Sequence, residues 1–133
     1  MTYEQACRAI KEHFETQWGG ITPMIYPNEM EDIGSPAYFG RMTIRPGSGR
    51  QVAVGGRQHR RTGVVIVQLF AEQGTGQDAM GALEEEAVRI FTDNIVSDIR
   101  FFNVGADRIG PDGRGYFQSN VNASFQFDVT QGA

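Results

Sequence analysis

The chain has 133 residues, of which 40% are hydrophobic and 11% aromatic, and its formal net charge at pH 7 is −4. This composition excludes a disordered chain, the length favours one domain over residues 1–133, and no apolar run is long enough to span a membrane. The single cysteine, Cys7, excludes an internal disulfide. The first residues lack the basic and apolar regions of a secretion signal, so we expect the cytoplasm as the compartment and no membrane partner.

The N-terminal part predicts a helix, a short strand and an acidic loop. Apolar residues recur at helical spacing over Thr2–Trp18, and Thr2 with Gln5 three residues later forms a capping box. A short strand is expected over Ile21–Tyr26. The loop that follows contains Glu29, Glu31 and Asp32. Because their spacing is not that of an EF-hand, we expect a solvated acidic loop and no metal site.

The next part of the chain predicts two strands with a long loop between them. Ala37–Arg45 alternates in the way of a strand. Pro46–Thr62 is rich in glycine and arginine and poor in large apolar residues, and a loop of this length in a small domain is usually functional or disordered. Val64–Ala71 is an apolar, β-branched run, which is typical of a strand covered on both faces. A second covered face in so small a domain indicates self-association.

A second helix is predicted over Gln77–Ile95, from the helical spacing of its apolar residues. It follows a break at Gly74-Thr75-Gly76, which lacks the lysine of a phosphate-binding P-loop. The break therefore predicts a chain turn and not a nucleotide site. Within the helix, we expect the three consecutive acids Glu84, Glu85 and Glu86 to lie on the solvent surface.

The C-terminal third predicts a hairpin. Ser97–Gly105 alternates as a strand, Gly110-Pro111-Asp112-Gly113 has the residues of a tight turn, and Tyr116–Asp128 alternates between an apolar and a polar face. The order of elements predicts an α+β fold. We expect a mostly antiparallel sheet with two helices packed on one face and a long Arg/Gly-rich loop.

Charge is distributed unevenly along the chain. The stretch from Ile33 to Ala71 contains no acidic residue and six arginines, whereas the rest of the chain holds all 16 acidic residues. Arginine favours fixed, bidentate contacts to carboxylate or phosphate. The segment Arg45–Thr62 is therefore the best functional candidate in the sequence, with the candidate residues Arg45, Arg50, Arg57, Arg60 and Arg61.

The sequence offers no candidate catalytic residue and no cofactor motif. The two histidines, His13 and His59, lie in different predicted elements, and no His/Cys/Asp cluster has the spacing of a metal site. Gly47-Ser48-Gly49 lacks the strand–turn–helix setting of a nucleophile elbow. We therefore expect a protein that is not an enzyme and has no cofactor.

The chain resembles the tail terminators of long-tailed bacteriophages over nearly its whole length. The similarity is carried by short architectural marks: Trp18, Pro23, Tyr26-Pro27-Asn28, Arg60-Arg61-Thr62-Gly63 before Val64-Val65-Ile66-Val67, Gly74-Thr75-Gly76, Asn120-Val121 and Phe125-Gln126-Phe127. Neck and tail-completion proteins have similar folds, so these marks also fit a connector of that kind.

The resemblance implies a virion structural protein that is assembled in the host cytoplasm and is located in the virion tail. It implies a homo-oligomeric ring, usually hexameric, that caps the tail tube protein, stops tube polymerisation and offers a surface for head–tail joining by a connector or neck protein. The arginine segment would then face the ring lumen or the tube, with transient contact to genomic DNA. The alternatives are a neck or tail-completion connector, and a nucleic-acid-binding module that uses the same arginines.

Overall fold

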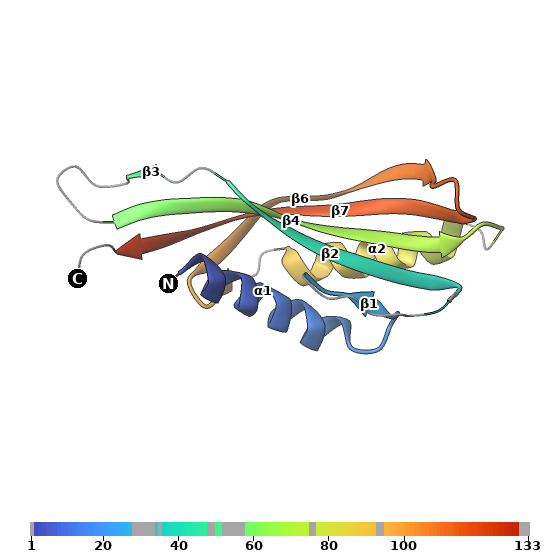
Figure 1. The fold of residues 1–133 in the computed structure, drawn as a ribbon, viewed down its shortest axis with the longest axis horizontal. Helices are drawn as coiled ribbons and strands as arrows, with labels where there is room; N and C mark the ends of the chain where they lie inside the picture. The colour runs from blue at the N-terminus through green and yellow to red at the C-terminus, as the bar shows by residue number, and fades with distance from the viewer. Residues whose placement is uncertain are drawn as a thin grey trace.

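The structure, a computed structural model, describes residues 2–27, 34, 36–47, 50–51, 58–74, 77–92 and 95–130. Figure 1 shows long strands running the length of an elongated molecule, with two helices beside them. The elements in chain order are α1 (Tyr3–Trp18), β1 (Met24–Ile25), β2 (Tyr38–Pro46), β3 (Arg50–Gln51), β4 (Gln58–Glu72), α2 (Gln77–Phe91), β5 (Ile95–Val96), β6 (Ile99–Pro111) and β7 (Tyr116–Thr130).

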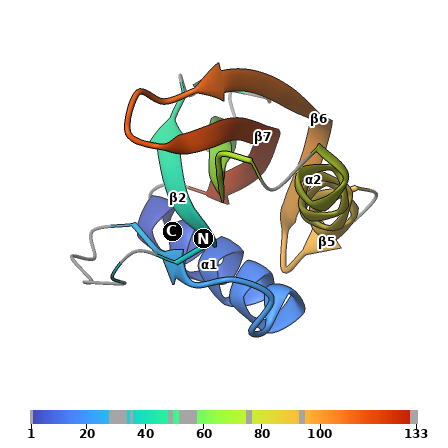
Figure 2. The same cartoon turned by 90° about the vertical axis from the view of Figure 1, so that its right-hand side faces the viewer.

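The strands form one mixed sheet in the order β1-β2-β4-β7-β6-β5, with β3 paired to β4. The β1–β2 pair is parallel, and the other described pairs are antiparallel. Two helices with such a sheet confirm the predicted α+β class. Figure 2, viewed along the strands, shows that the sheet is curved and that α1 and α2 lie at different points around it.

β4 is the central strand, and its apolar run explains this position. It pairs with β2 on one side and along its whole length with β7 on the other. Val65, Val67 and Leu69 are fully buried at alternate positions, and the alternate residues Val121, Ala123 and Phe125 of β7 are buried as well. The predicted alternation of β7 into an apolar and a polar face is thus confirmed.

The helices contribute aromatic side chains to the same core. Phe14 of α1 stacks against Trp18 at a centroid distance of 5.2 Å and against Phe91 of α2 at 5.7 Å. The predicted capping box of α1 is present, since Thr2 Oγ1 accepts from the Gln5 N–H at 3.1 Å and the Thr2 N–H donates to Gln5 Oε1 at 2.9 Å. The buried residues of both helices belong to one cluster with the inward-facing residues of β4 and β7.

Several expected boundaries were wrong. The second helix ends at Phe91, and Ile95 lies instead in β5 with 65% of its surface exposed. The hydroxyl of Thr92 donates to the Val88 carbonyl at 2.6 Å, so it occupies an acceptor at the end of the helix. The last two strands are also longer than expected. β6 continues to Pro111 before the turn, and β7 continues to Thr130.

The Arg/Gly-rich excursion is shorter than the sequence predicts. β4 begins at Gln58, so the last five residues of the expected loop are strand. The reason lies far away in the sequence: residues 125–130 of β7 pair with residues 58–63 and supply backbone partners that local composition cannot indicate. Figure 1 shows this part of β4 and β7 extending beyond α1.

Candidate functional site: an arginine-bearing sheet face

One face of the sheet carries the core, and the opposite face, which we call the outer face, carries mostly uncharged polar side chains. Strand alternation and register show which residues form the outer face. They are the odd-numbered residues of β2, the even-numbered residues of β4 and β7, and Arg100, Phe102 and Asp107 of β6. Its centre consists of half-exposed, uncharged residues: Thr43, Thr62, Val64, Ile66, Gln68, Gln118, Asn120, Asn122, Ser124 and Gln126. Depletion of charge at the centre of a surface is characteristic of protein interfaces.

The five predicted arginines do not form one loop. Arg45 is in β2 and is exposed, and Arg60 and Arg61 are in β4 on opposite faces of the sheet. Arg50 is in β3, and nothing is described of its side chain, while Arg57 lies outside the described residues. The prediction that all five belong to a loop is therefore corrected, because four of them, Arg45, Arg50, Arg60 and Arg61, are held by strand pairing.

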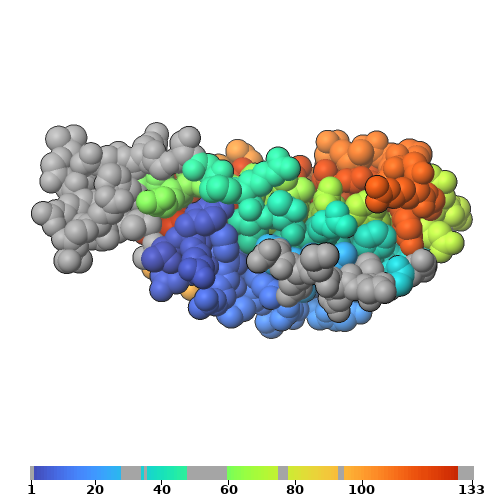
Figure 3. All heavy atoms as spheres, in the orientation of Figure 1, coloured from blue at the N-terminus to red at the C-terminus, as the bar shows by residue number. Residues whose placement is uncertain are grey.

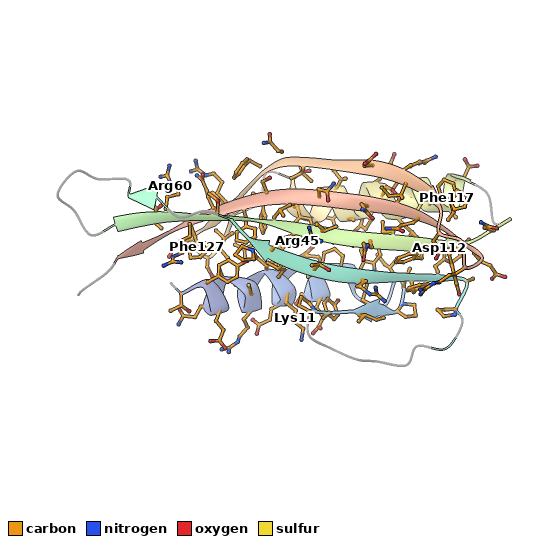
Figure 4. The ribbon with its side chains drawn as sticks, turned by 45° about the horizontal axis from the view of Figure 1, so that its top comes forward. Lys11, Arg45, Arg60, Asp112, Phe117 and Phe127 are labelled. Carbon is orange, nitrogen blue, oxygen red and sulfur yellow. The ribbon has the colours of Figure 1, made fainter. Side chains whose placement is uncertain are left out.

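Arg60 differs from Arg45 and Arg61 because its side chain forms an ion pair with another residue of the sheet. Its Nε donates to Asp128 Oδ1 at 3.2 Å, across the directly paired strands β4 and β7. The side chains are 32% and 45% exposed, so solvent screens this ion pair. Arg45 and Arg61 make no ion pair with the residues that the structure describes. Figure 4 shows Arg60 near the projecting end of the sheet and Arg45 nearer its middle.

Sequence reasoning missed two further arginines of the outer face. Arg41 on β2 and Arg100 on β6 are exposed, and neither makes an ion pair within the described part of the chain. Arg100 borders a polar hollow of about 150 Å³ that Arg60, Asp98 and Asp128 also line. Arg41 could have been identified from the sequence, because it lies in the acid-free stretch from Ile33 to Ala71. No local signal places Arg100 and Arg60 around the same hollow, because their proximity depends on the register of three strands.

The end of the outer face opposite Arg60 is closed by aromatic rings. Phe39 stacks on Phe70 at a centroid distance of 4.5 Å, and Tyr116 meets Phe39 edge-on at 5.0 Å. The Tyr116 hydroxyl donates to the Pro36 carbonyl at 2.8 Å. Asp112 fixes the adjacent β6–β7 turn, since its Oδ1 accepts from the backbone N–H of Arg114 and of Tyr116. Ring contacts and hydrogen bonds thus hold this end together, and Figure 4 shows Asp112 there.

The core side of the sheet contains one buried acid, which the sequence placed on the solvent surface. Glu84 of α2 is only 7% exposed. Its carboxylate accepts from the hydroxyl of Ser119 and from Nε and Nη2 of Arg108, with the Nη2 contact at 3.0 Å. The prediction that Glu84 is a surface residue was thus wrong. Because the donors are on β6 and β7, these hydrogen bonds anchor α2 to the sheet.

A groove of about 570 Å³ runs between α2 and β6 next to this cluster, lined by Gly81, Val88, Ala106 and Arg108 among others. On the same helix, Arg89 forms a bidentate pair with Glu86, with Nη2 at 2.6 Å from Oε1. The hydrogen bond from Arg89 lowers the pKa of Glu86 and raises that of Arg89. Among the charged residues that line the groove, Glu84, Arg89 and Arg108 have ion-pair partners, whereas Glu85 makes no ion pair with a described residue.

The described residues contain no group of three His, Cys, Asp or Glu side chains that could hold a metal ion. The acidic loop with Glu29, Glu31 and Asp32 lies outside the described residues. No helix in the described ranges is long and apolar enough to cross a membrane.

Comparison with known proteins gives a fold but no family. No family model and no curated protein matches the sequence. A solved structure of a protein whose name describes no function is similar, with a TM-score of 0.61 and 16% sequence identity, and the match covers 90% of this chain and 94% of that chain. At this identity the likeness shows the fold alone, and it does so over nearly the full length of both chains.

Proposed function

We propose that this chain is a structural tail terminator of a long-tailed phage or prophage. It assembles as a ring on the end of the tail tube, stops tube polymerisation and provides the head-joining surface. The observation that carries the proposal is the outer face, whose uncharged centre lies between exposed arginines without described ion-pair partners. Such a surface is suited to docking against other proteins.

The proposal includes the finer features of the fold expected from the sequence, a mostly antiparallel sheet with both helices on one face. The pairing of β1 with β2 is the parallel exception among the described pairs. In support of a shared helical face, buried side chains of α1 and α2 join the same core cluster as inward-facing residues of β4 and β7. This arrangement leaves the outer face free of helices and available for docking.

The elongated shape supports a role at a junction between two assemblies. Figure 3 shows that the described part of the molecule is longer than it is wide. Arg60 and Phe127 lie toward one end of the sheet, and Asp112 and Phe117 lie toward the other (Figure 4). In the proposed ring, one end contacts the tail tube protein and the other contacts the head connector, while the lumen passes the DNA. A heterologous contact that is repeated around an axis closes such a ring.

Electron microscopy of particles from the parent phage with this gene disrupted tests the proposal. Tails of abnormal, variable length without heads are expected, because nothing would stop tube growth. Tails of normal length that fail to join heads would instead indicate a neck or tail-completion connector. Normal infectious particles would contradict any role in the tail.

A paired substitution tests the role of the arginines. Arg45→Ser together with Arg100→Ser should impair capping while the melting temperature stays unchanged, because both arginines are on the outer face and neither has an ion-pair partner within the described ranges. Arg8→Ser is the matched control, since Arg8 is an exposed arginine on α1. Capping at the wild-type level by the double variant would contradict contact through these two arginines.

The exposed arginines Arg41, Arg45 and Arg100 favour a nucleic-acid-binding module as the second candidate function. Guanidinium groups on an exposed sheet face can neutralise phosphates, and such binding weakens steeply as salt rises. Filter binding of duplex and single-stranded DNA at low and high salt distinguishes the two functions. Tight, strongly salt-dependent binding would favour the module, whereas a terminator needs at most weak contact with DNA in its lumen.

A further inference from the structure

The sheet has two edges that are only partly covered. On β2, the parallel strand β1 pairs with Gly40 and Arg41, and no described strand pairs with residues 42–46 on that side. On β6, β5 pairs with Ile99 and Arg100, and no described strand pairs with the rest of β6 on that side. Uncovered strand edges present backbone groups that a further strand can pair with.

The backbone groups of the β2 edge point toward the uncovered side. The Gly40 N–H donates to the Pro23 carbonyl at 2.9 Å, which fixes the direction of its backbone groups toward β1. Since backbone direction repeats every second residue, Met42 and Ile44 present their N–H and C=O groups on the same side. β2 keeps an unbroken register with β4 and ends at Pro46, which has no N–H. The edge is therefore regular but short.

The regular part of the β6 edge is about as short as the uncovered part of the β2 edge. Register shifts interrupt β6 between Phe102 and Gly105 and between Arg108 and Gly110. Four residues, Gly105–Arg108, remain regular between these irregularities. Three of the four exposed large hydrophobic residues within the described ranges lie on β5 and β6, namely Ile95, Phe102 and Ile109. An apolar edge of this kind is usually covered in the assembled state.

Beside the uncovered stretches of the two edges, the outer face carries opposite charges, since Asp107 is on β6 and Arg41 and Arg45 are on β2, while Arg100 of β6 lies where β5 covers the edge. One row of cross-strand neighbours runs from Arg41 through Gln68 and Asn120 to Asp107. Arg41 and Asp107 are exposed, and neither makes an ion pair with a described residue. They are three strand spacings apart, roughly 14 Å, which is too far for direct contact within one copy. Arg45 adds a second positive charge to the β2 edge.

We propose that β2 of one copy of this chain pairs with β6 of the next, so that the sheets of neighbouring copies join edge to edge. The proposal rests on the proposed ring and names the surfaces that form it. Strand direction alternates from β2 through β4 and β7 to β6, so repeating the sheet in the same orientation places β6 of the next copy antiparallel to β2. The unpaired Arg41 and Arg45 then lie beside Asp107 of the neighbouring copy.

Reversal of the charges on each edge tests this contact. One variant carries Arg41→Glu and Arg45→Glu, and a second carries Asp107→Arg. Each alone brings like charges together at every contact, so the yield of normal-length, head-joined tails should fall about tenfold or more. When the two variants are expressed together, alternating copies restore opposite charges at every contact, and the yield should return to near the wild-type value. Arg8→Glu, a charge reversal at an exposed position of α1, is the control and should leave the yield of normal-length, head-joined tails unchanged.

Sedimentation velocity of the purified variants, alone and mixed, measures the same contact without tails. The mixture should form assemblies larger than either variant forms alone, and circular dichroism should show that both variants are folded. Edge pairing would be overturned by a folded mixture whose assemblies are no larger than those of either variant alone. It would also be overturned by single variants that sediment in the same way as the wild type. Normal tails after gene disruption would refute the terminator function but would leave the sedimentation result as a test of edge pairing.

Discussion

The carboxylate of Glu84 on α2 accepts a hydrogen bond from the hydroxyl of Ser119 on β7, and both residues are buried. Arg108 on β6 adds two charge-assisted donors to the same carboxylate. A charged group that is removed from water needs all of its partners, because each lost hydrogen bond leaves desolvation uncompensated. Ser119 therefore connects the centre of the sheet to the second helix.

Replacing Ser119 tests this connection. Ser119→Ala removes the donor and leaves one oxygen of Glu84 with fewer partners, so the free energy of unfolding should fall by about 1–3 kcal/mol. Ser124→Ala is a matched control on the same strand, because Ser124 lies on the outer face, and it should change stability by no more than about 0.5 kcal/mol. Urea denaturation measures both, and equal midpoints for the two variants would contradict a role for Ser119 in holding α2.

Close packing at Gly63 supplies a second prediction. A Cβ at this position would lie 2.5 Å from the Phe125 ring and 2.6 Å from the backbone carbonyl oxygen of Arg45. The backbone of β2 cannot move away without breaking its pairing with β4, so Gly63→Ala should destabilise the fold by about 1–3 kcal/mol. Gly105→Ala, on β6, meets nothing within 4 Å and serves as the control. Thermal denaturation should show a lowered melting temperature for Gly63→Ala only.

The elements with strong local signals could be predicted from the sequence. The capping box of Thr2 and Gln5, the apolar run of β4 and the alternation of β7 all correspond to structure, because each depends on neighbours in the chain. Glu84 could not be placed in this way. Helical spacing puts it on the same face as Met80 and Ala87, but an acid is buried only where partners exist. Its partners Arg108 and Ser119 are 24 and 35 residues away.

The candidate site was only partly predictable for the same reason. The acid-free stretch drew attention to Arg45, Arg60 and Arg61 because they share one segment of the sequence. Their division between the two faces of the sheet follows from strand pairing with residues near the C-terminus. The exposed Arg100 comes from a different segment altogether and joins the outer face only through the register of β6 with β7.

The pair of Glu86 and Arg89 predicts a small dependence of stability on acid pH. The hydrogen bond from Arg89 lowers the pKa of Glu86 in the folded state. A lowered folded-state pKa contributes stability above the unfolded value, and this contribution is lost as the pH falls through the folded value. Glu86→Gln should therefore reduce stability slightly at pH 7 and match the wild type in strong acid. Glu85→Gln, at an exposed position without a described ion-pair partner, should leave the wild-type pH dependence intact in urea titrations at each pH.

Tyr3 predicts a dependence on alkaline pH. Its hydroxyl oxygen is buried and has no hydrogen-bond partner among the described residues. Burial raises the pKa of the Tyr3 phenol above its ordinary value of 10.0, and the nearby Cys7 adds to this effect. A raised folded-state pKa means that the associated stability is present below the unfolded value and is lost as the pH rises toward the folded value. The wild type should therefore lose stability above about pH 10 as the unfolded chain ionises.

Tyr3→Phe should remove that loss. The ring still packs near Phe125 and Phe127, whose centroids lie 6.3 and 6.2 Å from that of Tyr3, while the hydroxyl that must stay neutral is gone. Because burial also raises the pKa of Cys7, the comparison belongs in a Cys7→Ala background, where the thiol cannot titrate. In that background, denaturation between pH 8 and 11 should give a shallower fall in unfolding free energy for Tyr3→Phe than for Tyr3. Parallel curves would mean that the Tyr3 hydroxyl reaches water or a partner in solution.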